Sequence, residues 1–276
     1  MIYITGDTHG TDGVKERFNT SNFPEQREMT KNDYVIVLGD WGVHWKNNYP
    51  SGKICLENKP AVAGQEGEVK DERNTLNWLD EKNFTTLFID GNHECFPRLN
   101  SYPVVDFCGG KAHQIRPSIY HLMRGETFLI DGKTFFAFGG ASSHDIQDGI
   151  IDPVNYKDKK SLNQAINRWN KERRMFRVKN LSWWEAEMPT REEMENGIMN
   201  LEKNGNKVDF IISHTAPASI IALIGQGLYQ VDEVEKYLED IRINTEYKNW
   251  FFGHMHDNRR INDKDYLLWE QIIRIN

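Results

Sequence analysis

The chain has 276 residues, of which 38% are hydrophobic and 27% charged, and its net charge is −7. This composition excludes an intrinsically disordered chain, and the acidic balance argues against binding to duplex nucleic acid or to an anionic membrane. The three cysteines form no CxxC pair and no even framework, which predicts reduced thiols in a cytoplasmic protein. We expect neither a signal peptide nor a membrane span, because residue 1 leads directly into a strand pattern and no apolar run reaches about 18 residues.

Five short apolar runs, each followed by polar residues, predict buried strands. They lie at residues 2–5, 34–38, 86–89, 210–212 and 250–252. Continuous apolar runs are typical of strands that are covered on both faces. Helical patterns lie between them, at about 71–83, 161–176, 190–204 and 232–243. Strands that alternate with helices predict an α/β sheet.

The stretch from about 118 to 139 indicates a more antiparallel sheet. Its three apolar runs are separated by Arg124-Gly125-Glu126 and Asp131-Gly132-Lys133, which predict two hairpin turns. The runs at 266–270 and 271–275 again indicate strands. The polar, turn-rich region 43–70 predicts a long functional or mobile insertion. Because the polar clusters at both ends of the chain complement each other, we expect one domain over residues 1–276.

Residues with metal-binding side chains follow each of the five predicted strands. In open α/β sheets, ligands bind beyond the carboxyl ends of the strands. The residues at these positions are Asp7, His9, Asp40, Asn92, His214, His254 and His256. Each one alone has an ordinary explanation, since an aspartate there often caps the next helix and a lone histidine is often a hydrogen-bonded surface residue. Seven together favour a metal centre.

The donor set indicates which metal ions suit this centre. It mixes carboxylate, amide and imidazole groups without a thiolate, which favours Mn, Fe, Co, Ni or Zn and argues against a structural zinc site. Seven ligands exceed what one catalytic ion needs, and they suit two ions about 3.5–4 Å apart that share a bridging carboxylate. Such cations would also supply the local positive charge that an acidic protein needs to hold a phosphate-bearing substrate.

Five blocks of sequence carry a resemblance to a known family. In chain order they are Gly6-Asp7-Thr8-His9, Gly39-Asp40, Gly91-Asn92-His93-Glu94, His214 and Gly253-His254-Met255-His256. Together they resemble the calcineurin-like metallophosphoesterase family over nearly the whole chain, and segments 139–145 and 182–185 are similar to those of uncharacterised bacterial and phage members. The resemblance implies an α/β (α+β) fold, a four-layer sandwich of two mixed β-sheets flanked by helices.

The resemblance also implies a role for each matched residue. One metal ion is bound by Asp7, His9 and His256, the other by Asn92, His214 and His254, and Asp40 bridges the two. A hydroxide that bridges the ions is the nucleophile, and His93 is the catalytic residue that stabilises charge or protonates the leaving group. We expect manganese, with Fe, Zn, Co and Ni as alternatives.

One departure from the family pattern concerns phosphate binding. In the protein phosphatases of this family a further Asp and an Arg that contacts phosphate follow the bridging Asp, whereas here Asp40 is followed by Trp41-Gly42-Val43-His44. This argues against a phosphoprotein phosphatase, although Glu94 after His93 is the residue that those enzymes use.

The substrate-binding candidates are His44, Arg173 and Arg174. Arg173 and Arg174 belong to a basic cluster that is otherwise a solvated helix face, and His44 is otherwise an ordinary residue. His113, His121 and His144 have no supporting spacing and are assigned no role.

The segment near 140–190 has two interpretations. It either forms a rim that shapes the substrate pocket or is a Gly-rich turn with packed tryptophans at Trp183-Trp184, and the second is favoured. The predicted function is hydrolysis of a phosphate mono- or diester. The alternatives are a nuclease or nucleotide phosphodiesterase, and a non-catalytic scaffold that keeps the fold. We expect a phosphate-ester substrate and no membrane or duplex partner.

Overall fold

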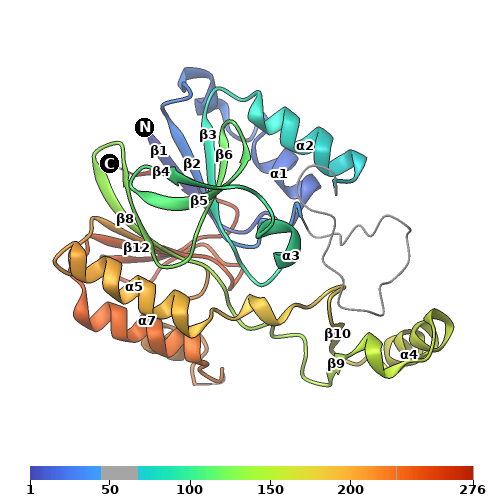
Figure 1. Cartoon of the computed structure of the whole chain (residues 1–276). Helices are drawn as coiled ribbons and strands as arrows, with labels where there is room; N and C mark the ends of the chain where they lie inside the picture. Colours follow the sequence, from blue (N-terminus) through green and yellow to red (C-terminus); the bar gives the residue numbers. More distant parts are fainter. Residues whose placement is uncertain (45–67, 228, 276) are drawn as a thin grey trace.

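Two mixed β-sheets packed face to face form the centre of the protein, and helices cover their outer faces (Figure 1). This computed structural model describes residues 1–44, 68–227 and 229–275, so most of the predicted 43–70 insertion lies outside the described residues. The predicted four-layer α/β architecture is confirmed. Within the described residues, no helix combines the length and the apolar character that crossing a membrane requires.

The first sheet has the strand order β15-β1-β2-β3-β6-β5-β4. Its bounds are β1 Ile2–Thr5, β2 Tyr34–Leu38, β3 Thr85–Ile89, β4 Val104–Phe107, β5 Gly110–Arg116, β6 Ile119–Leu122 and β15 Ile272–Ile275. Strands β1, β2, β3 and β6 run parallel, and the edges are antiparallel. The carboxyl ends of β1, β2 and β3 therefore meet at one edge of this sheet.

The second sheet has the order β13-β14-β12-β11-β8-β7. Its bounds are β7 Glu126–Ile130, β8 Lys133–Phe138, β11 Phe210–Ser213, β12 Asn249–Phe252, β13 Arg259–Arg260 and β14 Asp265–Leu267. Strands β8, β11, β12 and β14 are parallel. The carboxyl ends of β11 and β12 thus lie side by side.

Alternating side chains on the strands build three layers of core. On β1, Ile2 and Ile4 pack between the sheets against residues such as Phe135 and Phe251, while Tyr3 faces the outer core with Phe18. Burial on both faces explains why these strands are continuous apolar runs in the sequence. A third core lies under the helices on the outer face of the second sheet.

The helices cover the two sheets from opposite sides (Figure 1). Near the first sheet lie α1 Thr11–Arg17, α2 Lys70–Asp80 and the short α3 Phe96–Leu99, and near the second lie α5 Arg191–Lys203, α6 Ala218–Ile224 and α7 Glu233–Asn244. Side chains cap the starts of α5 and α7, where Thr190 and Asp232 accept bonds from the third helical amide.

Residues 145–180, which we call the arm, project from the sandwich (Figure 1). The arm contains β9 Gly149–Ile151, α4 Lys159–Lys171 and β10 Phe176–Val178, and β9 pairs in parallel with β10. It has a small core of its own, with Ile151, Leu162 and Val178 buried. Trp184, beyond the arm, is buried against Cys95 and Phe96. For Trp184, this burial agrees with the favoured interpretation of the segment as a turn with packed tryptophans.

Two local predictions are wrong. Arg124-Gly125 is not a hairpin turn but the crossing from one sheet to the other, because β6 pairs in the first sheet and β7 in the second. Gly125 has a φ of 76° and lies against the backbone of α5, and Arg124 is buried on Asp90. The helix expected to reach residue 176 ends at Lys171, because Arg173 has a φ of 54° and turns the chain into β10.

His44, a predicted substrate-binding residue, lies in the core instead. Its side chain is buried, and Nε2 lies 3.1 Å from the hydroxyl of Tyr102. That hydroxyl donates to Glu68, whose carboxylate pairs with Arg116 at 2.7 Å. Burial lowers the pKa of His44 well below its usual value, so it is neutral here. A buried histidine in this network has no open side for a substrate.

The buried Glu68–Arg116 pair generates a stability prediction. Glu68→Gln leaves the Arg116 charge buried without its counter-charge, so we expect a loss of about 3 kcal/mol in the free energy of unfolding, measured by urea denaturation. The matched control is Glu246→Gln, because Glu246 pairs with Lys207 on the surface and its loss is expected to leave the midpoint unchanged. Equal midpoints for the two variants would show that the buried pair does not stabilise the fold.

Candidate metal centre and active-site pocket

Side chains from five strand ends converge at the edge where the two sheets meet. Asp7 and His9 follow β1, Asp40 follows β2 and Asn92 follows β3. His214 follows β11, and His254 and His256 follow β12. The metal-ligating atoms of six of them form two groups, and Asp40 belongs to both. Segments separated by more than 240 residues thus meet at one carboxylate.

The first group joins the loop after β1 to the loop after β12. Nε2 of His256 lies 3.2 Å from Oδ2 of Asp7 and 2.8 Å from Nε2 of His9. Oδ2 of Asp40 lies 3.8 Å from Nδ1 of His9. One donor atom from each of these four residues lies within 4.8 Å of the others.

The second group joins Asp40 to His214 and His254. Oδ1 of Asp40 lies 3.3 Å from Nε2 of His214, and the same nitrogen lies 3.3 Å from Oδ1 of Asn92. Nδ1 of His214 donates to the Leu38 carbonyl at 2.8 Å, which directs Nε2 toward Asp40 and Asn92. Asp40 therefore turns one oxygen toward each group.

Backbone conformation aims four of these side chains. His9, Asp40, His254 and His256 all have positive φ, between 41° and 68°. Residues other than glycine rarely adopt this region, and such strain persists only where the surrounding structure enforces it. The strand–loop junctions hold these residues in conformations that an isolated chain would avoid.

Two glycines allow the loops to approach each other. A Cβ on Gly91 would clash with the side chains of Asp40 and His214, and one on Gly253 would clash with the carboxylate of Asp7. Only a residue without a side chain fits at either position. Each of these glycines directly precedes a candidate ligand, Asn92 or His254.

These polar groups fit a cation better than they fit one another. Oδ2 of Asp7 is buried and accepts no hydrogen bond from the described residues, since His256 lies 3.2 Å away without hydrogen-bond alignment. Nε2 of His9 lies 2.8 Å from Nε2 of His256, so one of the two nitrogens must carry a proton when no ion lies between them. Oδ1 of Asp7 accepts the backbone amide of His254 at 3.1 Å, but a buried oxygen without a donor, such as Oδ2, is costly, and a bound metal ion would satisfy it.

Without bound metal ions, Asp40 and His214 form a buried pair of opposite charges. Burial opposes a positive charge on His214, but Asp40 and Asp7 outweigh burial and raise its pKa to about 9. Burial would raise the pKa of Asp40, but His214 lowers it well below the usual value. Burial together with His214 and His144 lowers the pKa of His254 well below its usual value, so that imidazole is neutral, as a metal ligand must be.

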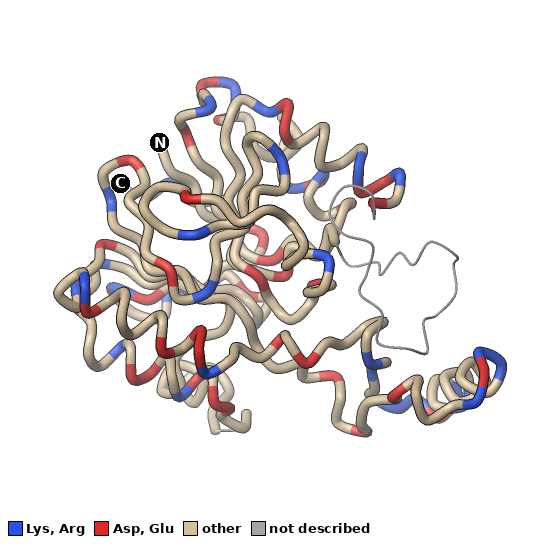
Figure 2. The backbone as a smooth tube through the Cα atoms, viewed as in Figure 1, with Lys and Arg blue, Asp and Glu red and all other residues tan. Residues whose placement is uncertain are grey.

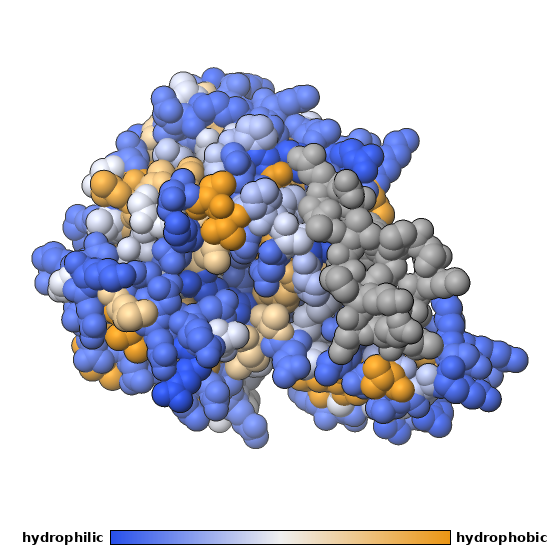
Figure 3. Space-filling model, viewed as in Figure 1, coloured by the Kyte–Doolittle hydropathy of each residue, from blue (hydrophilic) through white to orange (hydrophobic). Residues whose placement is uncertain are grey.

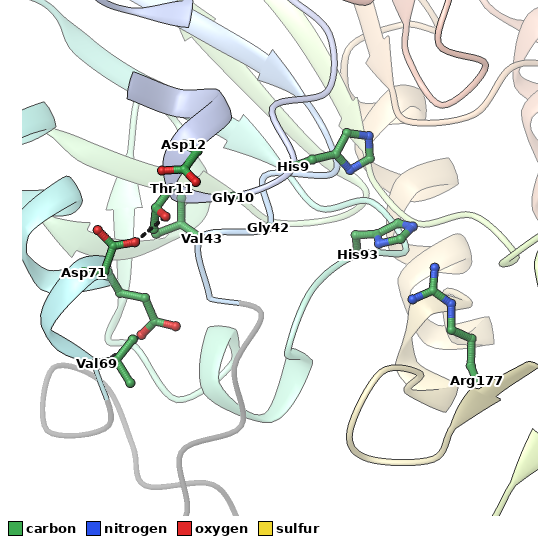
Figure 4. A pocket seen from close by; sticks show the side chains of 11 residues that line it. His9, Gly10, Thr11, Asp12, Gly42, Val43, Val69, Asp71, His93 and Arg177 are labelled. Carbon is green, nitrogen blue, oxygen red and sulfur yellow. Dashed lines mark hydrogen bonds between the residues drawn. The ribbon is translucent and has the colours of Figure 1, made fainter. Parts of the chain in front are cut away.

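A pocket of about 360 Å³ opens beside this centre (Figure 4). His9 and His93 line it on the side of the metal centre, and the guanidinium of Arg177 points toward His93 from β10. Thr11 and Asp71, joined by a hydrogen bond, line the other side. The backbone amide of His93 donates to Oδ1 of Asp40 at 2.9 Å, which fixes the histidine beside the shared carboxylate.

Arg177, rather than Arg173 or Arg174, brings positive charge to the pocket. Arg177 is half-buried and pairs with Asp145. Arg173 is exposed beyond the end of α4, and Arg174 pairs with Glu172 at 2.6 Å over the ring of Trp169. The prediction that Arg173 or Arg174 faces the substrate is therefore not supported, because a turn at Arg173 separates the helix from β10 and only Arg177 of the three lines the pocket.

Residues that the sequence did not identify contact the candidate ligands Asn92 and His254 or support them through hydrogen bonds. The Asn92 amide donates to Ser143 at 3.3 Å, and Ser143 donates to Glu187 at 2.7 Å. Nε2 of His144, which the sequence left without a role, lies 3.1 Å from Nε2 of His254. Ser143 and His144 precede the arm and Glu187 follows it, so both of its connections to the sandwich touch residues of the candidate centre or their neighbours.

The departure after Asp40 has a structural reason. Trp41 is buried and stacks on Phe88 at 4.7 Å between ring centroids. Glu94 is buried too, and its carboxylate accepts the amide of Trp41 at 2.7 Å. Burial, together with Asp40 and Asp90, raises the pKa of Glu94 well above its usual value. Both side chains therefore join the loops after β2 and β3 and do not face the pocket.

Comparison with known proteins agrees with this arrangement. The sequence profile of calcineurin-like phosphoesterases matches residues 1–258. The chain belongs to the calcineurin-like phosphoesterase family. A search of curated proteins found no match. Membership of this phosphoesterase family accounts for the fold, and the family uses divalent metal ions for hydrolysis of phosphate esters; the Asp and His groups around Asp40 are the residues here that can hold such ions.

The buried Asp40–His214 pair predicts how the stability of the protein without bound metal ions depends on pH. The pKa of His214 is raised in the folded state, so the stability contributed by its proton is complete below the ordinary pKa of 6.5 and is lost as the pH rises to about 9. We expect the free energy of unfolding of chelator-treated protein to fall across this window by up to about 1.4 kcal/mol per pH unit. Urea denaturation at several pH values measures it.

The control for this prediction is Asp40→Asn, which removes the main group that raises the pKa of His214. The variant should show a flatter profile between pH 6.5 and about 9. A wild-type profile as flat as that of the variant would contradict the raised pKa of His214.

Proposed function

We propose that the protein hydrolyses a phosphate ester with two metal ions held at the convergent strand ends. Asp7, His9 and His256 would hold one ion, Asn92, His214 and His254 the other, and Asp40 both. The observation that carries the proposal is the position of Asp40, whose two oxygens face the two groups of donors. Mixed carboxylate, amide and imidazole donors favour Mn, with Fe, Zn, Co and Ni as alternatives.

When bound, two such ions would supply an activated water and would neutralise charge on the phosphate oxygens. The chain's own groups then position the ester. Arg177 offers a planar guanidinium at the pocket, suited to two phosphate oxygens at once. His93 lies between Arg177 and the metal centre, where it can stabilise charge or give a proton to the oxygen of the departing alcohol as the P–O bond breaks.

A panel of phosphate esters tests the proposal. Turnover of bis(p-nitrophenyl) phosphate and of p-nitrophenyl phosphate is compared on purified protein with Mn(II) added and with metal content measured. Preference for the diester supports a phosphodiesterase or nuclease, and preference for the monoester supports a phosphatase. Failure to hydrolyse either ester with any divalent metal would favour a non-catalytic scaffold. The segment Trp41-Gly42-Val43-His44, which contains no arginine after Asp40, argues against a phosphoprotein substrate.

We also propose that the protein works in a reducing compartment such as the cytoplasm. Cys95 is buried and Cys108 half-buried, and both are free thiols. Burial raises the pKa of Cys95 to about 12, which makes that thiol unreactive.

Arg177→Ala is predicted to lower kcat/KM for a phosphate ester by about 10²-fold, the scale for loss of one donor to a charged transition state. Arg177→Lys should recover part of the activity, because it keeps the charge without the planar pair of donors. The matched control is Arg174→Ala, because that arginine pairs with Glu172 outside the pocket. Equal rates for Arg177→Ala and Arg174→Ala would exclude the proposed phosphate contact.

His93→Ala should leave the metal content unchanged while lowering turnover by about 10²-fold or more, the scale of lost acid–base catalysis. If His93 protonates the leaving group, the loss is smaller for a nitrophenyl ester than for an alkyl ester, because nitrophenolate leaves without a proton. Metal analysis and rates on both esters check this together. Loss of metal from the variant would show that His93 is a ligand instead.

A further inference from the structure

Positive charge is concentrated in one short part of an acidic chain. Residues 157–179 contain nine lysines or arginines and two acidic residues, whereas the net charge of the whole chain is −7. This stretch spans α4 and β10 of the arm, and Figure 2 shows blue segments on both. The rest of the chain is correspondingly more acidic, so among these surfaces the arm attracts a polyanion.

Helix α4 presents unpaired positive side chains on one face. Leu162 and Trp169 pack on the small core of the arm. At 3.6 residues per turn, Lys160, Arg168 and Lys171 fall on the opposite face. All three are exposed, and none forms an ion pair within the described residues. A face without counter-charges keeps its full attraction for phosphates.

The charged arm is continuous with the active-site pocket. Arg177 on β10 lines the pocket beside His93, a few residues after α4 ends at Lys171. The chain that enters the arm also contacts the metal centre, where His144 lies 3.1 Å from His254. A polyanion on the arm therefore has a next phosphate within reach of the pocket.

We propose that the arm binds single-stranded nucleic acid and presents one of its phosphodiesters to the pocket. This inference rests on the proposed function, since it names the substrate class of the same site. Single strands bind where positive side chains follow the backbone and apolar or aromatic surface receives unpaired bases. Figure 3 shows a hydrophobic patch on the arm beside its hydrophilic surface. Among the residues of the arm, Val154 and Met175 are 59% and 43% exposed.

The dimensions favour a single strand over a duplex. Helix α4 has 13 residues, or about 20 Å of length, and offers one row of charges. The pocket of about 360 Å³ accepts one nucleotide-sized group, whereas a duplex of about 20 Å diameter does not enter it. A duplex also hides its bases, which leaves the apolar patch of the arm without a partner.

A charge reversal on α4 tests the proposal. Binding of a fluorescent phosphorothioate oligothymidylate, which resists hydrolysis, is measured by anisotropy on metal-loaded protein at several salt concentrations. Lys160→Glu/Lys171→Glu should weaken binding by about tenfold or more at low salt. It should also flatten the slope of log affinity against log salt by about 1.4, at roughly 0.7 per lost phosphate contact.

The matched control is Lys203→Glu/Lys236→Glu, which makes the same charge change at exposed positions on α5 and α7, away from the arm (Figure 1). It should bind within about twofold of wild type at about 0.15 M salt, where the Debye length is about 8 Å, because both helices lie away from the arm (Figure 1). Turnover of bis(p-nitrophenyl) phosphate is measured on both variants to verify folding and metal content.

Each outcome decides a separate point. Equal weakening by both double variants, or wild-type protein that binds no oligothymidylate at low salt, overturns the proposal. So does α4-dependent binding of phosphatidylserine vesicles without binding of the oligonucleotide. Ester turnover without oligonucleotide binding overturns only the arm inference, whereas α4-dependent binding without turnover of any ester or oligonucleotide overturns only the proposed function.

Discussion

The structure depends on two carboxylates, Asp7 and Asp40, that are almost fully buried. Asp7 lies beside His256, and Asp40 lies beside His214. Buried charges are tolerated only where they are paired or coordinate metal ions. Without metal, the proton that Asp40 stabilises on His214 compensates the charge of Asp40, and Oδ2 of Asp7 remains without a donor among the described residues. Metal binding and folding are therefore linked through the same side chains.

The two sheets make this arrangement possible. Each contributes parallel strands whose carboxyl ends meet at one edge, and the core between the sheets fixes their relative position. Loops alone would not hold His9, Asp40, His254 and His256 at positive φ. The free energy of packing in the sandwich thus supports strain at the centre, and glycines such as Gly91 and Gly253 remove the steric obstacles.

The sequence predicted the parts that repeat a local rule. Buried strands such as β1 and β2 appear as apolar runs with the expected bounds, and polar residues at their ends mark the edge where donors converge. It failed where distant contacts decide the outcome. Arg124-Gly125 has the composition of a hairpin turn, yet the buried contact of Arg124 with Asp90 and the packing of Gly125 on α5 carry the chain to the other sheet.

The same limit applies to the substrate-binding candidates. His44 stands four residues after Asp40, but Tyr102, nearly 60 residues later, holds it in the core. The sequence pattern predicted Arg173 and Arg174, and not Arg177, as phosphate-binding residues, because a periodic pattern does not reveal where a helix stops. The left-handed backbone at Arg173 ends the helical face and turns Arg177 to a different side. The spacing of residues along the sequence predicts neither a long-range contact nor the position of a single backbone turn.

The arm brings an arginine to the pocket, whereas the segment after Asp40, Trp41-Gly42-Val43-His44, contains none. Trp41 and His44 are both buried, so a cation at the pocket comes from another element. Arg177 reaches the pocket from an element whose two connections contact the centre, through Ser143 and His144 on one side and Glu187 on the other. Since Ser143 orients the amide of Asn92, the group that would hold the metal and the group that would hold the phosphate are fixed relative to each other. The placement of charge at the pocket is thus tied to the geometry of the donors.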